Sequence, residues 1–138
     1  MAEQKNIHSE QRKHLRVNID LDMYLVLVDT NAEGVVSGND RIKLRHGKIN
    51  DISLAGLKIT TQDMVPALEF HLLSGSITLA VKFTLPKSNG SISAMAKATW
   101  FKQVINLQGR YFTMGLKFIE ISPQDQSTIT TFIAEHKK

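Results

Sequence analysis

The sequence contains no cysteine, few aromatic residues and no long apolar run. Without cysteine there is no disulfide framework and no thiol catalysis, and a reducing, cytoplasmic setting is expected. No run of about 18 apolar residues occurs, so neither a transmembrane helix nor membrane insertion is expected. The polar N-terminus also lacks the apolar stretch of a signal peptide. The five histidines are scattered without ligand spacing, so we expect no metal site and no cofactor.

Familiar catalytic motifs are missing as well. There is no G-x-S-x-G, H-E-x-x-H, P-loop or dinucleotide glycine fingerprint. Asp51 and Ser53 could act as base and nucleophile, but no histidine intervenes, and such a pair usually makes hydrogen bonds within a turn. We therefore expect a binding protein and not an enzyme.

Length and composition predict one domain. The 138 residues suffice for a single core, and 42% apolar and 22% charged residues are ordinary values for a globular protein. Residues 1–14 lack a hydrophobic period, which predicts a flexible N-terminal tail before a single domain over residues 15–138. The net charge of +4 would suit an anionic partner, and would equally suit none.

Alternation of apolar and polar residues predicts several short strands. Val17, Ile19, Leu21 and Met23 alternate with polar residues, as expected for a half-buried strand. The same period appears over residues 76–85, 92–100 and 111–121, and further strands are predicted on either side of residues 53–56. Small residues at inward positions of residues 92–100 are typical of a tight barrel.

Ser122 and Pro123 mark the start of a C-terminal helix, with serine at the N-cap and proline at the first helical position. The segment from Thr61 to Gly75 has only loose helical spacing and is predicted to be an apolar covering loop with a short helical turn. The fold is therefore predicted to be mainly β: a six-stranded antiparallel β-barrel with a C-terminal α-helix.

One predicted strand has a basic face. We expect Ile42 and Leu44 to face inward, while Arg41, Lys43 and Arg45 face outward. A solvated face that resists edge pairing is the favoured interpretation, and an anion-binding face is the alternative.

Two short motifs carry the main functional signal. Arg12 and Arg16 form R-x-x-x-R, and Asp51, Ser53 and Gly56 form D-x-S-x-x-G at a turn between two predicted strands. Together they make a plausible clamp for phosphate and guanine. The ordered pair resembles the signature of PilZ domains, which are small bacterial receptors for cyclic di-guanylate. The stretch Gly115–Phe118 is similar to the closing strand of that family.

The resemblance implies a role for each motif residue. Arg12 and Arg16 would fork onto phosphate or guanine, or stack on the base. Asp51 would accept from the N1–H and N2–H edge of guanine. Ser53 would supply a hydroxyl to base or phosphate, and Gly56 would let the backbone come close.

The same resemblance suggests a switch. Lys13 and His14 lie between the arginines and are further candidates for ligand contact. We expect cyclic di-guanylate to order the segment Arg12–Arg16 over the barrel, and a downstream protein partner to read the changed surface.

Two other functions fit the pattern. The first is a small basic barrel that binds single-stranded nucleic acid through Arg41, Lys43 and Arg45, with Trp100 or Phe101 facing outward. The second is an interaction module without a ligand, which would dock through the segment from Thr61 to Gly75. Cyclic di-guanylate binding is preferred to both, so nucleic acid is not the expected partner.

Overall fold

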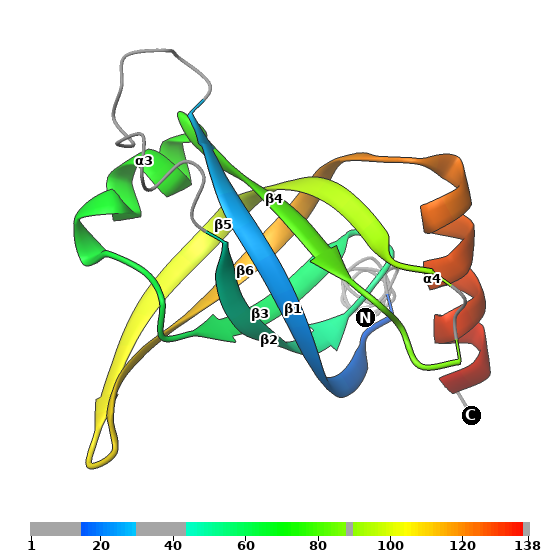
Figure 1. The fold of residues 1–138 in the computed structure, drawn as a ribbon, viewed down its shortest axis with the longest axis horizontal. Helices are drawn as coiled ribbons and strands as arrows, with labels where there is room; N and C mark the ends of the chain where they lie inside the picture. The colour runs from blue at the N-terminus through cyan, green and yellow to red at the C-terminus, as the bar shows by residue number, and fades with distance from the viewer. Residues whose placement is uncertain (1–14, 30–43, 88–89, 137–138) are drawn as a thin grey trace, which may run out of the picture.

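Six strands and two helices make up the described part of the chain in the computed structural model (Figure 1). The described residues are 15–29, 44–87 and 90–136, so Arg12, Lys13, His14, Arg41 and Lys43 lie outside them. The elements are β1 (Val17–Asp29), β2 (Arg45–Ile52), β3 (Gly56–Thr61), the 3-10 turn η1 (Pro66–Leu68), α3 (Glu69–Ser74), β4 (Ile77–Phe83), β5 (Ile92–Asn106), β6 (Gly109–Ile121) and α4 (Pro123–His136).

The strands pair in a closed ring in the order β1-β2-β3-β6-β5-β4. Every pairing is antiparallel, and each strand has a neighbour on both sides for at least part of its length. The predicted mainly β fold of six antiparallel strands followed by a C-terminal helix is confirmed. Because the ring closes, the sheet has no full-length free edge.

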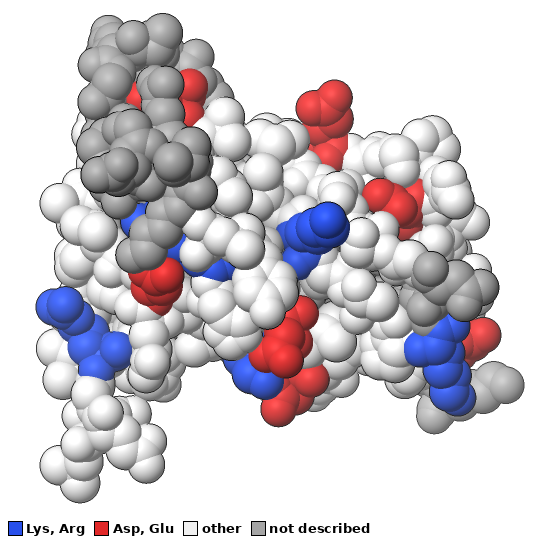
Figure 2. Space-filling view, in the orientation of Figure 1, with Lys and Arg blue, Asp and Glu red and all other residues white. Residues whose placement is uncertain are grey.

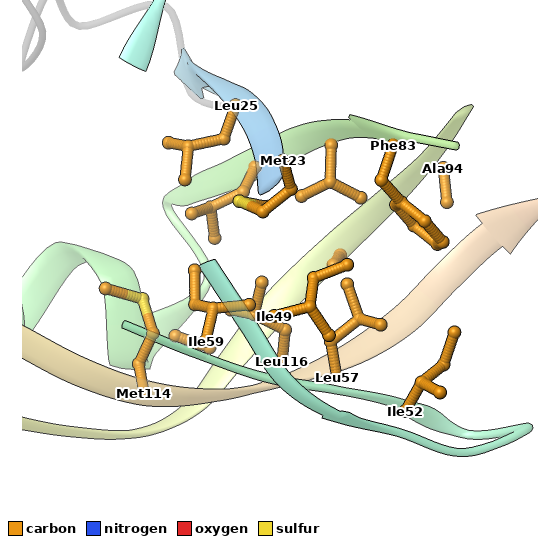
Figure 3. Packing of buried hydrophobic residues seen from close by; sticks show 14 of the residues in the cluster. Met23, Leu25, Ile49, Ile52, Leu57, Ile59, Phe83, Ala94, Met114 and Leu116 are labelled. Carbon is orange, nitrogen blue, oxygen red and sulfur yellow. The ribbon is translucent and has the colours of Figure 1, made fainter. Parts of the chain in front are cut away.

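Apolar side chains of alternate residues fill the inside of the ring (Figure 3). Met23 and Leu25 meet Ile49 and Ile59 there, and all four are almost fully buried. Three alanines of β5 also point inward, which allows opposite walls to approach. They are Ala94, Ala96 and Ala98.

Helix α4 begins as its sequence predicts. The backbone N–H of Asp125 donates to Ser122 Oγ at 3.1 Å, and the Asp125 carboxylate accepts from the backbone N–H of Ser93 at 3.2 Å. The helix therefore has a satisfied first turn and a tie to β5. Its buried residues are Ile129, Phe132 and Ile133. No helix in the described part of the chain combines the length and the apolar character needed to span a bilayer.

Arg45 and Leu44 have the reverse of their predicted orientations. Arg45 is 1% exposed and Leu44 is 63% exposed. Arg45 Nε donates to the Asp63 carbonyl at 3.0 Å and lies 3.8 Å from the Asp63 carboxylate. A buried guanidinium needs such acceptors. The prediction of an outward Arg45 is therefore wrong, because its partner comes from a segment that alternation does not reveal.

The segment from Thr61 to Gly75 closes one end of the ring. It contains η1 and α3, in agreement with the predicted covering segment with a short helical turn. Leu72 is fully buried, and Lys97 Nζ donates to the Leu73 carbonyl at 2.9 Å. Gly75 ends α3 with φ of 88°, a conformation that favours glycine.

Polar side chains on the outer face of β1 and β2 form a small charged network. Asp22 Oδ1 lies 2.9 Å from His46 Nε2 and 3.0 Å from Lys48 Nζ. The hydrogen bond to His46, and to a smaller extent the one to Lys48, holds the pKa of the Asp22 carboxyl below its ordinary value. This network explains why the polar side of the first predicted strand tolerates closely spaced acids.

Replacing Arg45 should destabilise the fold. Arg45→Ala is expected to lower the free energy of unfolding by about 2–5 kcal/mol, as for other large buried side chains, because it leaves a cavity and frees the segment carrying Asp63. Urea denaturation measures this. The exposed Lys82 provides the control, since Lys82→Ala should change stability by less than about 0.5 kcal/mol. Equal midpoints for the two variants would contradict the anchoring role.

Candidate functional site

A hollow of about 230 Å³ lies on the outer surface where β2, β3, β6 and β5 are adjacent. It brings together four residues of the predicted clamp, which are Arg16, Asp51, Ser53 and Gly56. The other lining residues are Ala55, Leu57, Lys58, Thr99, Trp100, Gly115, Leu116 and Lys117. The remaining predicted site residues, Arg12, Lys13 and His14, lie outside the described residues.

The turn between β2 and β3 is organised by Ser53. Its Oγ accepts the backbone N–H groups of Ala55 and Gly56, each at 3.2 Å, and lies 3.4 Å from the Gly56 carbonyl. The Ser53 N–H also donates to that carbonyl at 2.9 Å. Ser53 is only 7% exposed. Its hydroxyl is therefore already engaged within the turn and fixes where Asp51 and the turn backbone lie.

Gly56 is required for a close approach between two strands. A Cβ at this position would lie 1.8 Å from the Leu116 carbonyl oxygen, well inside contact distance. The φ of Gly56 is not positive. Glycine is therefore needed here because it has no side chain, and not because of a left-handed backbone conformation.

Cross-strand pairing places four residues in one row across the floor of the hollow. Asp51 pairs with Lys58, Lys58 with Gly115, and Gly115 with Trp100. Directly paired residues of neighbouring antiparallel strands share a face of the sheet. A carboxylate, an ammonium group and an indole therefore face the same space.

Trp100 is the main site residue that the sequence motifs did not identify. A Cβ on Gly115 would lie 2.2 Å from Trp100 Nε1, so the indole lies directly over this glycine. Trp100 is 41% exposed, whereas Phe101 turns inward with its ring centroid 5.4 Å from that of Phe112. The sequence signal was the Trp–Phe pair, one member of which had to face outward.

The hollow combines positive charge with one carboxylate. Arg16, Lys58 and Lys117 supply three cations, and Asp51 supplies the acid. The cations can bind an anion, and the Asp51 carboxylate can accept hydrogen bonds from a neutral donor. The Trp100 indole can stack on a planar ring. Among the residues that the structure describes, no three His, Asp or Glu side chains converge as metal ligands would.

Comparison with known structures gives the same fold. MotI (DgrA), the inhibitor of motility of Bacillus subtilis, is 15% identical to this chain with a TM-score of 0.62. The superposition covers 91% of this chain and 51% of the MotI chain. The PilZ domain of YcgR from Escherichia coli with c-di-GMP is 12% identical with a TM-score of 0.60, covering 92% of both chains. MrkH of K. pneumonia in its complex with c-di-GMP is 17% identical to this chain with a TM-score of 0.56. The superposition covers 92% of this chain and 55% of the MrkH chain.

These identities are low, so the likeness establishes the fold alone. The chain spans about half the length of MotI and MrkH, and almost the whole of the YcgR domain. No curated protein sequence is similar enough to this chain to count as a relative. A match to the PilZ domain family, however, extends over residues 10–135. Because that match takes in both sequence motifs and all six strands, the chain belongs to the PilZ domain family.

Proposed function

We propose that the protein is a receptor for cyclic di-guanylate and that the hollow beside the Ser53–Gly56 turn is its binding site. The observation that carries the proposal is the convergence of Arg16, Asp51 and Trp100, which are far apart in the sequence, on one outer surface. The ligand presents two phosphates and two guanines. These are the groups that cations, a carboxylate and an aromatic platform bind best.

Each side chain has a distinct task in the proposed complex. Arg16 forks onto a phosphate or onto guanine O6 and N7. Asp51 accepts the N1–H and N2–H pair of one guanine, and Trp100 stacks on a base. Lys58 and Lys117 add charge near the phosphates. Ser53 holds the turn, since its hydroxyl already makes hydrogen bonds to the backbone.

Two of the similar structures support this ligand. The YcgR PilZ domain and the MrkH complex described above each contain cyclic di-guanylate. Transfer of the ligand to this chain rests on the shared family together with the hollow, and not on overall similarity.

Binding is a better explanation of the site than catalysis. Ser53 is the candidate nucleophile, but its oxygen accepts two backbone N–H groups and is almost buried. A nucleophile needs a free lone pair and a neighbouring base. The Asp51–Ser53 pair therefore acts in turn geometry and recognition.

The size of the hollow supports a role for the N-terminal arm. Sites that enclose a whole small-molecule ligand usually have volumes of about 300–1,000 Å³. The hollow measures about 230 Å³ and is open to solvent, so part of a cyclic dinucleotide would remain uncovered. We infer that Arg12, with Lys13 and His14, closes over this part. The covered surface is then what a partner protein reads, in the cytoplasm of a bacterial cell.

The nucleic-acid alternative is weakened by the burial of Arg45. A basic outer face made of Arg41, Lys43 and Arg45 cannot use a guanidinium that is bound to Asp63 inside the fold. The ligand-free interaction module has α3 in its favour, because Phe70 is 74% exposed there.

Arg16 should be essential for affinity. A charge-assisted hydrogen bond contributes about 1.5–3 kcal/mol, so Arg16→Ala should weaken cyclic di-guanylate binding about 10- to 150-fold. Isothermal titration calorimetry measures this. Arg110→Ala removes an exposed arginine outside the hollow and should leave the Kd unchanged. Undiminished affinity of Arg16→Ala would refute the proposed site.

Trp100 is the sole tryptophan, so its fluorescence reports directly on the hollow. Cyclic di-guanylate should quench the emission as guanine stacks on the indole. Trp100→Ala should cost about 1–3 kcal/mol of binding, while Trp100→Phe should retain most of it. Phe70→Ala removes an exposed aromatic on α3 and serves as the control. A ligand that binds by calorimetry without altering the emission would place the guanine elsewhere.

Ligand should protect the N-terminal arm from protease. Trypsin cleaves after Arg12, Lys13 and Arg16, and saturating cyclic di-guanylate should slow cleavage there several-fold if these residues are held against the ring. Mass spectrometry of the early fragments identifies each cut. Asp51→Asn, which weakens recognition of guanine, should reduce the protection at equal ligand concentration. Cleavage at an unchanged rate in the saturated wild-type protein would rule out closure of the arm.

A further inference from the structure

The β5–β6 hairpin extends well beyond the ring of strands. Pairing of β5 with β4 ends at Ala96, and pairing of β6 with β3 ends at Phe112. The two strands nevertheless pair with each other as far as Asn106 and Gly109. Figure 1 shows this yellow hairpin projecting from the molecule at the end opposite α4. Its outer part is therefore a two-stranded ribbon, with none of the other described strands beside it.

The tip of the hairpin is apolar and fully accessible. Leu107 is 106% exposed and Ile105 is 72% exposed. Val104 and Tyr111 pair directly, and Ile105 pairs with Arg110. Successive residues of a strand alternate between faces, so Val104 and Ile105 point to opposite sides of the ribbon. Apolar side chains are thus present on both faces of the ribbon next to the turn, in which Leu107 lies between the polar residues Asn106 and Gln108.

The turn holds these side chains in place. The backbone N–H of Gln108 donates to Asn106 Oδ1 at 2.9 Å, and Gly109 has φ of 131°, which favours glycine. Leu107 therefore sits at the apex of an ordered turn. Nothing in the described residues covers it.

The charges on the hairpin itself are of one sign. Residues 97–117 contain four Lys and Arg residues and no Asp or Glu. Lys102 lies on the stem of the hairpin, paired with Thr113. Arg110 is paired with Ile105 beside the turn, and its guanidinium lies 5.8 Å from the centroid of the Phe112 ring. Figure 2 shows blue side chains at the stem above a white tip, at the lower left. Exposed apolar side chains at the tip, with cations next to them on the hairpin, are complementary to an anionic bilayer surface.

We propose that this hairpin is a peripheral membrane contact: its tip enters the headgroup region of an anionic bilayer while Lys102 and Arg110 meet lipid phosphates. The ribbon has unpaired backbone groups along both edges, so it cannot enter the hydrocarbon core, and the contact is shallow and reversible. That no helix in the described residues is suited to span a bilayer does not bear on such contact. The hairpin tip is distinct from the hollow, and the proposal does not depend on the ligand.

Co-sedimentation of the full chain with vesicles tests the proposal. Vesicles of equal parts phosphatidylglycerol and phosphatidylcholine should bind the protein, vesicles of phosphatidylcholine alone should bind it much less, and added salt should release it. Replacing both Ile105 and Leu107 with serine should weaken binding at least about tenfold. Phe70→Ser, which also removes an exposed apolar side chain, should bind like wild type.

A second measurement guards against misfolding and against other docking modes. The chain lacks cysteine, so Leu107→Cys can carry an environment-sensitive dye at a single site, with Phe70→Cys as the matched control. On addition of anionic vesicles, the emission maximum should shift to shorter wavelength only for the dye at position 107. Binding that survives the double serine substitution, equal binding to both lipids, or no vesicle binding would each overturn the proposal. Circular dichroism and urea denaturation check that the variants are folded.

Discussion

The pairing of β3 with β6 closes the ring, and it depends on how closely the two backbones meet at Gly56. Any Cβ there would collide with the Leu116 carbonyl. On one side of this contact the turn through Ser53 is held by four hydrogen-bonding contacts to its own backbone. On the other, the Phe118 N–H donates to the Ala55 carbonyl at 2.9 Å. Gly56 and Ser53 therefore have a structural role in closing the ring, and the proposed binding site lies beside that closure.

Closure explains why the proposed site lies where it does. Antiparallel register carries Asp51, Lys58, Gly115 and Trp100 across four strands in one row. A second glycine, Gly115, leaves room for the indole to lie flat on the sheet. The two glycines thus have different roles: Gly56 allows two backbones to meet, and Gly115 leaves space for the Trp100 side chain. This row is formed by strand pairing alone, so this part of the proposed site is in place without a ligand.

Two parts of the molecule extend beyond the ring of strands, and both lie away from the hollow. The segment carrying η1 and α3 is fastened by buried Arg45 and by Lys97, and it exposes Phe70. The β5–β6 hairpin exposes Leu107 in the turn that follows β5, the strand that carries Trp100. The molecule therefore combines a ring of regular strand pairing with two regions, α3 and the β5–β6 hairpin, that expose large apolar side chains.

Local chemistry in the sequence determined the strands, the start of α4 at Ser122 and the D-x-S-x-x-G turn, because alternation, capping and glycine each act over a few residues. The tertiary structure alone decided that Arg45 is buried while Leu44 is exposed, that Trp100 lies over Gly115, and how far the hairpin projects. Alternation marks two faces of a strand without saying which one is covered. That choice depends on register and on partners such as Asp63, which belong to distant segments and meet the strand only when the ring closes.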